Sequence, residues 1–262
     1  MTPLMGKRIL VTRPRAQAAE LADKLIACSA VPILFPTIEI APLEDYTALD
    51  NAIRLISQYR WLIFTSVNGV AAFWSRLRAA SVDERSLAET RIAAIGPATA
   101  KAVAHHGHLA SLIPDEYIAE AIVPSLGEVR GHWILLPRAE IAREALVVEL
   151  ERQGAVVHEI AAYRTLPAVP NPNGLIELKR GVDAITFTSS STVRNFIELI
   201  NNYPVNLLNP LTLIACIGPI TTQTAHELGL RVDVVAREYT THGLVTALLD
   251  YYAHLQSPVS DR

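Results

Sequence analysis

The sequence predicts an α/β protein built from two doubly wound, parallel-sheet domains. Short apolar runs alternate with amphipathic helical stretches along the chain, as in proteins that place helices on both faces of a sheet. The apolar runs are nearly continuous, which is typical of strands covered on both faces. The second half of the chain also repeats the pattern of the first half, so we expect the same unit twice.

The repeat consists of paired segments that occur in the same order in both halves. RILVTRP at 8–14 pairs with WILLPRA at 133–139, and LIFTSVNGV at 62–70 pairs with ITFTSSSTV at 185–193. The later pairs are IAAIGPATA at 92–100 with IACIGPITT at 214–222, and EYIAEAIV at 116–123 with EYTTHGLV at 238–245. A period of about 125 residues is too long for a solenoid unit, so the pattern indicates a tandem duplication of a domain.

The first copy contains the elements of one α/β domain. Its apolar runs predict strands at 8–12, 31–41, 61–65, 91–95 and 109–113. Helices are predicted at 15–29, 47–58, 68–79, 97–106 and 117–126. The first helix follows from the spacing of Ala18, Leu21 and Leu25. Gly107 and Gly229 stand where a helix end favours positive φ.

The segments 31–42 and 155–167 are unusually long extended stretches rich in Ile, Val and Pro. Each would span about 40 Å as a strand. We therefore expect the chain to cross between the two domains twice, with a cleft between them.

Composition excludes several classes of protein. The formal charge of −3 lacks the basic excess of a general nucleic-acid binder. There is no apolar run of about 18 residues, so no membrane association is expected. The apolar run near the N-terminus is too short for a signal peptide, which predicts a cytoplasmic protein. Cys28 and Cys216 lie in apolar segments and are expected to be buried thiols.

Ligands of parallel sheets bind beyond the carboxyl ends of the strands, and the two copies place similar residues there. Helix N-termini at these positions suit a carboxylate or a phosphate. Each residue also has a purely structural interpretation, as a helix cap or, for the arginines, as one half of a surface ion pair. The substrate-binding candidates are Arg13, Ser66, Asn68, Gly96, Thr99, Arg138, Ser189, Ser191, Gly218 and Thr221.

Several catalytic motifs are absent, among them GxxxxGK[ST], GxGxxG, HExxH and GxSxG. His105, His106 and His108 leave a metal site open, but they surround a predicted helix end where cationic side chains favour the dipole. We expect no metal. Tyr163 breaks the repeat, because its counterpart is Ile38. It is either a packing residue or a proton donor.

The ordered motifs ILVTRP, IFTSVNGV, AAIGPATA, LLPRAE, GAVVHEIAAYRT, ITFTSSSTV and ACIGPITT resemble the uroporphyrinogen-III synthase family over nearly the whole chain. The resemblance implies a cofactor-independent lyase of tetrapyrrole biosynthesis. Such an enzyme cyclises linear hydroxymethylbilane with loss of water and inverts the last ring through a spiro intermediate. It also implies two flavodoxin-like domains joined by a two-stranded β-ladder, with exchanged segments: residues 1–36 plus 168–262, and 37–167.

By the same resemblance Tyr163 is the proton donor or an orienting group. Thr99, Thr221, Ser66, Ser189 and Ser191 would line the cleft. Positive potential from Arg13 and Arg138 is our own inference from their paired positions. A monomer is the default expectation, and a transient contact with hydroxymethylbilane synthase is plausible.

Two other classes stay open on the residues alone. Two α/β domains around a cleft also describe a small-molecule sensor or receptor. A nucleotide-binding regulator is the third possibility, weakened by the missing phosphate-loop motifs.

Overall fold

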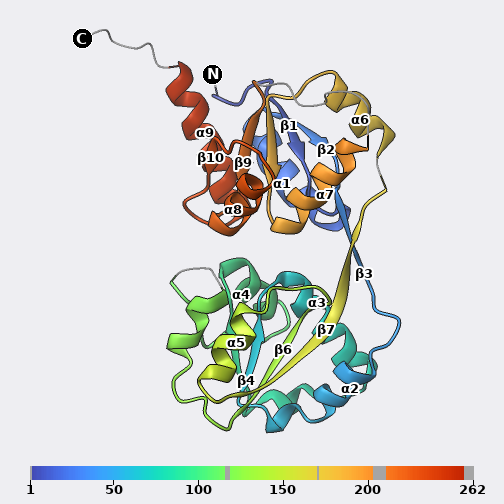
Figure 1. Cartoon of the computed structure of the whole chain (residues 1–262), viewed down its shortest axis with the longest axis vertical. Coiled ribbons are helices and arrows are strands. Elements are labelled where there is room, and N and C mark those ends of the chain that lie inside the picture. Colours follow the sequence, from blue (N-terminus) through green and yellow to red (C-terminus); the bar gives the residue numbers. More distant parts are fainter. Residues whose placement is uncertain (1, 116–118, 170, 203–210, 257–262) are drawn as a thin grey trace, which may run out of the picture. The chain divides into compact units, whose positions relative to one another are not determined.

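The computed structural model describes residues 2–115, 119–169, 171–202 and 211–256 (Figure 1). The chain forms two compact units. The first unit consists of Met1–Glu39 and Leu166–Arg262, and the second unit consists of Ile40–Thr165. Each unit is built on its own five-stranded sheet with helices on both faces. Within the described ranges, no helix is long and apolar enough to cross a membrane.

The sheet of the first unit has the flavodoxin-type strand order. Strands β2 (Val31–Leu34), β1 (Arg8–Val11), β8 (Ala184–Phe187), β9 (Leu213–Cys216) and β10 (Val234–Val235) follow one another across it. All pairs are parallel, and in chain order the sequence across the sheet is 2-1-3-4-5. The first two strands of the chain therefore lie in one sheet with the last three. The surrounding helices are α1 (Arg15–Ala27), α6 (Pro172–Lys179), α7 (Ser190–Asn201), α8 (Pro219–Glu227) and α9 (Thr241–Gln256).

Two apolar layers cover the faces of this sheet. On one face Leu21 and Leu25 of α1 pack with Leu244 and Leu248 of α9. On the other face the core is aromatic, with Phe35, Phe187 and Phe196. Strands β8 and β9 are buried at every position. This confirms that the continuous apolar runs of the sequence belong to strands covered on both sides.

The sheet of the second unit shares four places of this order, with its chain segments rearranged and β3 added at one edge. Strands β3 (Ile38–Ala41), β7 (Val156–Pro167), β6 (Trp133–Ala139), β4 (Trp61–Phe64) and β5 (Arg91–Ala94) follow one another. The pairs β7–β6, β6–β4 and β4–β5 are parallel. Compared with the first unit, β7 and β6 take the places of β2 and β1, β4 and β5 take the places of β8 and β9, and β3 is an additional strand beside β7. The helices are α2 (Thr47–Arg54), α3 (Val67–Ala79), α4 (Pro97–Ala104) and α5 (Ala145–Arg152), with short 3-10 helices η1 (Ile56–Gln58), η2 (Glu84–Leu87) and η3 (Ala119–Ser125).

Most predicted elements are confirmed, and three predictions are wrong. Segment 31–41 is two strands in different sheets, because Phe35 turns into the core and Thr37 bonds the Thr12 and Thr192 carbonyls. Segment 109–113 forms only the isolated bridge between Ala93 and Leu112. The helix expected at 117–126 is a 3-10 helix over 119–125, and residues 117 and 118 lie outside the described part. Segment 155–167 is confirmed as one long strand. Cys216 is buried as expected, whereas Cys28 is half-buried.

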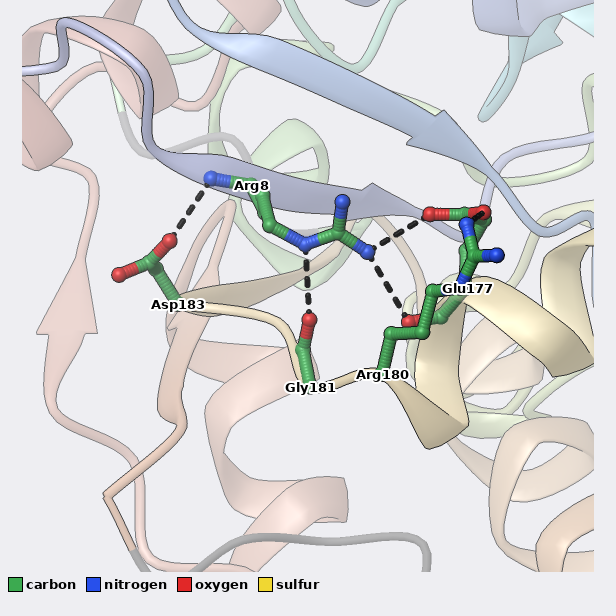
Figure 2. A network of polar contacts seen from close by, with 5 residues as sticks. All are labelled: Arg8, Glu177, Arg180, Gly181 and Asp183. Carbon is green, nitrogen blue, oxygen red and sulfur yellow. Dashed lines mark hydrogen bonds and ion pairs between the residues drawn. The ribbon is translucent and has the colours of Figure 1, made fainter.

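Polar contacts fix β1 beside β8 at the amino end of the first sheet (Figure 2). Arg8 donates from Nε to the Gly181 carbonyl at 2.9 Å and from Nη2 to the Glu177 carboxylate at 2.7 Å. The backbone N–H of Arg8 donates to Asp183 at 2.8 Å. These contacts join the start of the chain to the segment between α6 and β8.

Candidate functional site

Each sheet has one point where the strand order reverses, and ligands of open parallel sheets bind beyond the carboxyl ends of the strands at such a point. In the first unit this point lies between β1 and β8, which are followed by Arg13 and Ser189. In the second unit it lies between β6 and β4, where Arg138 and Ser66 stand. Each point therefore combines candidates from opposite halves of the sequence.

Tyr163 and Ser66 meet at the reversal point of the second unit. The phenol oxygen of Tyr163 lies 3.0 Å from the Ser66 hydroxyl, and Tyr163 is 8% exposed. Ser66 is also the N-cap of α3, since its Oγ accepts from the Gly69 N–H at 3.0 Å. Tyr163 is the register partner of Ala139, directly after an irregularity in the pairing of β6 with β7. The strand end and the helix start therefore hold the phenol from two sides.

The surroundings of the Tyr163 phenol suit a proton donor. Burial raises its pKa, so the group is protonated near neutral pH. Hydrogen bonding to Ser66 and Asn68 and the charge of Arg138 act in the opposite direction, because they stabilise the anionic form. The phenol thus carries a proton to give and has polar groups beside it that stabilise the phenolate left behind.

Arg138 is held by other protein groups. Its Nη1 lies 3.1 Å from the Glu159 carboxylate, and its Nη2 donates to the Arg143 carbonyl at 2.8 Å. The side chain is only 7% exposed, so the charge lies within the protein beside Tyr163.

Gly69 lets α3 approach the end of β6. A Cβ atom at this position would lie 2.8 Å from the Pro137 carbonyl oxygen, closer than real Cβ contacts. The counterpart of Gly69 in the repeat is Thr192, whose side chain completes the capping box of α7. The second unit therefore has no side chain where its helix start meets the strand carrying Arg138.

Gly96 and Thr99 lie at the neighbouring strand of the same sheet. Gly96 is the N-cap of α4, Pro97 is its first residue, and Thr99 is buried. The backbone of Gly96 is extended, at φ −170°, so this glycine makes no left-handed turn. The predicted strand-to-helix turn is confirmed.

The first unit repeats this arrangement with different polar contacts. Ser189 caps α7, and its hydroxyl lies 3.0 Å from that of Ser191. Gly218 precedes α8, where a Cβ would come within 3.1 Å of the Tyr239 ring. Thr221 is buried in the first turn of α8. The hydroxyl partner of Ser189 lies in its own helix start, whereas the hydroxyl partner of Ser66 is Tyr163 on another strand.

Arg13 is held more loosely than Arg138. Its guanidinium lies 3.5 Å from Glu20 and 3.3 Å from Gln17, both on α1. Burial lowers the pKa of Arg13, yet an arginine stays charged at neutral pH. This arrangement leaves the guanidinium able to receive an anion.

The histidines near residue 106 belong to a packing cluster. The His106 ring stacks on Trp74 at 4.7 Å between centroids, and His108 lies 3.3 Å from Glu84. Burial lowers the pKa of His106. Among the described residues, no group of three His, Cys, Asp or Glu side chains is placed to hold a metal ion.

A cavity of about 480 Å³ lies away from these strand ends, between β10 and α9. Its walls mix acidic and basic side chains, such as Asp250 and Arg237, and include none of the candidates. The candidates lie instead at the strand ends beside the reversal points, and in the second unit Tyr163 and Ser66 meet there. Glu159 and Gly69 were not identified from the sequence, although a carboxylate four residues before Tyr163 and a glycine opposite Thr192 were visible signals.

Comparison with known proteins gives a consistent result. A family model described as "Uroporphyrinogen-III synthase HemD" matches residues 19–246. A uroporphyrinogen-III synthase of Synechococcus elongatus is 41% identical over 253 residues, which cover 94% of this chain and 96% of the relative. A putative uroporphyrinogen-III synthase of Methanothermobacter thermautotrophicus is 32% identical and covers 91% of this chain and 96% of its own length.

Solved structures show the same fold. A uroporphyrinogen III synthase mutant from Thermus thermophilus matches 96% of this chain and 100% of its own, with a TM-score of 0.65 and 21% identity. The Helicobacter pylori enzyme described as uroporphyrinogen-III synthetase matches with a TM-score of 0.59 and 19% identity, over 96% of this chain and 100% of its own.

Proposed function

The chain belongs to the uroporphyrinogen-III synthase family, and we propose that Tyr163 is the proton donor of its reaction. The enzyme is a cofactor-independent lyase that cyclises linear hydroxymethylbilane to uroporphyrinogen III with loss of water. The observation that supports the role of Tyr163 is the convergence of Ser66, Asn68 and Arg138 on its buried phenol.

The reaction needs help mainly at its first step. The hydroxyl on the first ring leaves as water after accepting the proton of Tyr163, which gives an electrophilic azafulvenium cation on the substrate and a phenolate. Ser66 rotates its hydroxyl to donate to this phenolate at the observed 3.0 Å separation. The last ring then attacks through its substituted carbon to form the spiro intermediate. That intermediate fragments and recloses with the ring inverted, and the proton released on final closure returns to the phenolate.

Carboxylate binding is distributed over both units in our proposal. The substrate carries eight carboxylates, and the helix starts at the strand ends offer the positive ends of their dipoles to them. Arg13 supplies one positive charge, and its contacts with Glu20 and Gln17 are long, at 3.5 Å and 3.3 Å. The remaining candidates are the hydroxyls and helix-start backbones of Ser189, Ser191, Gly218, Thr221, Gly96 and Thr99.

We propose that the two units are duplicated, segment-exchanged domains of 1–36 plus 168–262 and of 37–167. Two points support this. Strands β1 and β2 share a sheet with the late strands, and β3 and β7 are neighbours that each extend across the division between the units. The strands β3 and β7 would be the connecting ladder. We also propose that the protein is monomeric and cytoplasmic. It would contact hydroxymethylbilane synthase only transiently.

The direct test is to incubate the purified protein with freshly made hydroxymethylbilane and identify the product isomer. The proposal expects uroporphyrinogen III, formed faster than the isomer that appears spontaneously. Tight binding of the bilane with no change in isomer ratio would instead identify a sensor.

A further inference from the structure

We propose that Arg138 is a positioning residue for Tyr163, clamped by Glu159, and that it does not bind a substrate carboxylate. The inference rests on the proposed role of Tyr163 as the proton donor. It goes further because it gives the two arginines of the repeat, Arg138 and Arg13, different tasks.

The first observation is that the protein itself already binds the guanidinium of Arg138. Glu159 provides a carboxylate oxygen at 3.1 Å, and the Arg143 carbonyl accepts from Nη2 at 2.8 Å. The side chain is 7% exposed. An incoming carboxylate would have to displace these contacts from a guanidinium that has little exposed surface, although Glu159 itself is 36% exposed.

The second observation is the contrast with Arg13, which stands at the same place in the other sheet. The contacts of Arg13 with Glu20 and Gln17 are longer, at 3.5 Å and 3.3 Å. Glu20 is 57% exposed, so it competes weakly with a substrate carboxylate for the guanidinium. The Arg13 side chain is itself only 12% exposed, so the two arginines differ in the length of their contacts and in the exposure of their partner carboxylates, which is 57% for Glu20 and 36% for Glu159. On these grounds anion binding is assigned to Arg13 and positioning to Arg138.

The third observation is where the clamped charge lies. Arg138 ends the strand that pairs with the Tyr163 strand, and Ala139, the next residue, is the register partner of Tyr163. Its charge acts on the phenol and stabilises the anionic form. When Tyr163 gives up its proton, the developing negative charge is met by a cation that is already in place, so little reorganisation is needed.

Glu159 holds the guanidinium of Arg138 in place through the ion pair. It lies on the same strand as Tyr163, four residues earlier, so the carboxylate and the phenol are held by one element. Loss of Glu159 would leave Arg138 charged but less firmly placed. We therefore expect a smaller effect from changing Glu159 than from changing Arg138.

Steady-state kinetics of four variants separate positioning from substrate binding. We expect Arg138→Met to lower kcat by about 10- to 100-fold with little change in KM. Arg138→Lys should recover part of kcat because it restores the charge, and Glu159→Gln should lower kcat only about 2- to 5-fold. The matched variant Arg13→Met should show the opposite split, a raised KM with kcat largely kept. A raised KM with unchanged kcat in Arg138→Met overturns the proposal.

A double-mutant cycle tests whether Arg138 acts through the phenol. In a Tyr163→Phe background there is no proton for Arg138 to influence, so adding Glu159→Gln or Arg138→Lys should cause no further loss of kcat. Multiplicative losses in the double variants would show an independent role and overturn the inference. Both variants keep polar side chains of similar size, and thermal unfolding checks that each one folds.

The same cycle separates the two proposals. If Tyr163→Phe retains full activity while the wild-type protein forms uroporphyrinogen III, the proton-donor role fails, and the inference on Arg138 fails with it. If Tyr163→Phe is slow but Arg138 variants change only KM, the proton-donor role stands and the positioning role alone is wrong.

Discussion

Ser66 connects the stability of a helix with the chemistry of the site, since one oxygen serves both. It accepts the Gly69 N–H as the cap of α3 and shares a hydrogen bond with the Tyr163 phenol. The sequence predicted the capping role and, by resemblance, a place beside the substrate. It did not predict that Ser66 contacts Tyr163, because the two residues are 97 positions apart and meet only through the order of the strands.

We predict that Ser66→Ala lowers both the stability of the protein and its turnover. Loss of the cap should reduce the free energy of unfolding by about 1 kcal/mol. Loss of the donor to the phenolate should reduce kcat by about tenfold or more. Chemical denaturation and isomer-resolved kinetics measure the two effects.

Asn171→Ala is the matched control, because Asn171 caps α6 in the first unit through the Asn173 N–H. It should lose similar stability and keep its kcat. An equal loss of kcat in the two variants would show that Ser66 acts on activity only through folding.

At the scale of elements, glycine at the third position of α3 decides how closely the helix start approaches β6. We predict that Gly69→Ala costs about 1–3 kcal/mol in the free energy of unfolding, because its Cβ would clash with the Pro137 carbonyl. Moving the helix start also moves Ser66 away from Tyr163, so kcat should fall as well.

Gly174→Ala provides the comparison, since Gly174 is the third residue of α6 and equally crowded. Its Cβ would lie 2.6 Å from the Phe35 ring. This variant should be destabilised without a change in the kcat of the molecules that fold. Unchanged kcat in Gly69→Ala would contradict the proposed link between α3 and the phenol.

Apolar periodicity identified strands that are covered on both faces, such as β4, and helices that pack one face against a sheet, such as α3. It failed where a tertiary contact overrides the local pattern. The run through Phe35 is as apolar as a single strand, but the burial of that ring and the bonds of Thr37 split it. The irregularity in the pairing beside Arg138 likewise could not be predicted from the sequence, because register is set by two strands together.

At the scale of the whole molecule, the first unit is assembled from both ends of the chain, and Arg8 lies at the junction. We predict that Arg8→Met destabilises the first unit by about 1–3 kcal/mol, because three hydrogen bonds to Glu177 and Gly181 are lost. The effect should appear as faster hydrogen exchange in β1, β2 and β8, with β4–β6 protected as before.

Arg180→Met removes only one contact, an exposed pair with Glu177, and serves as the control (Figure 2). Its effect should stay below about 0.5 kcal/mol. Faster exchange spread equally over both units would contradict the view that each unit has its own stability.

The repeated pattern was readable in the sequence, since its motifs recur in order, and family resemblance supplied the expectation of exchanged segments. Which candidates would share a unit was harder to foresee. Arg138 ends a strand that lies beside β4 of the first copy, and Arg13 follows a strand that lies beside β8 of the second copy. Similar motifs identified equivalent positions, whereas the different contacts of the two arginines appear only in three dimensions.

The central claim is that Tyr163 donates the proton, and one comparison tests it most directly. Uroporphyrinogen III formation should be measured for Tyr163→Phe beside Tyr59→Phe, a second buried tyrosine of the same unit that contacts His158 rather than the polar cluster. Tyr59 has no contact with Ser66, the partner of Tyr163, among the contacts described above. We predict that Tyr163→Phe slows turnover by about 10- to 1,000-fold while Tyr59→Phe keeps its kcat. Full activity of Tyr163→Phe would contradict the claim.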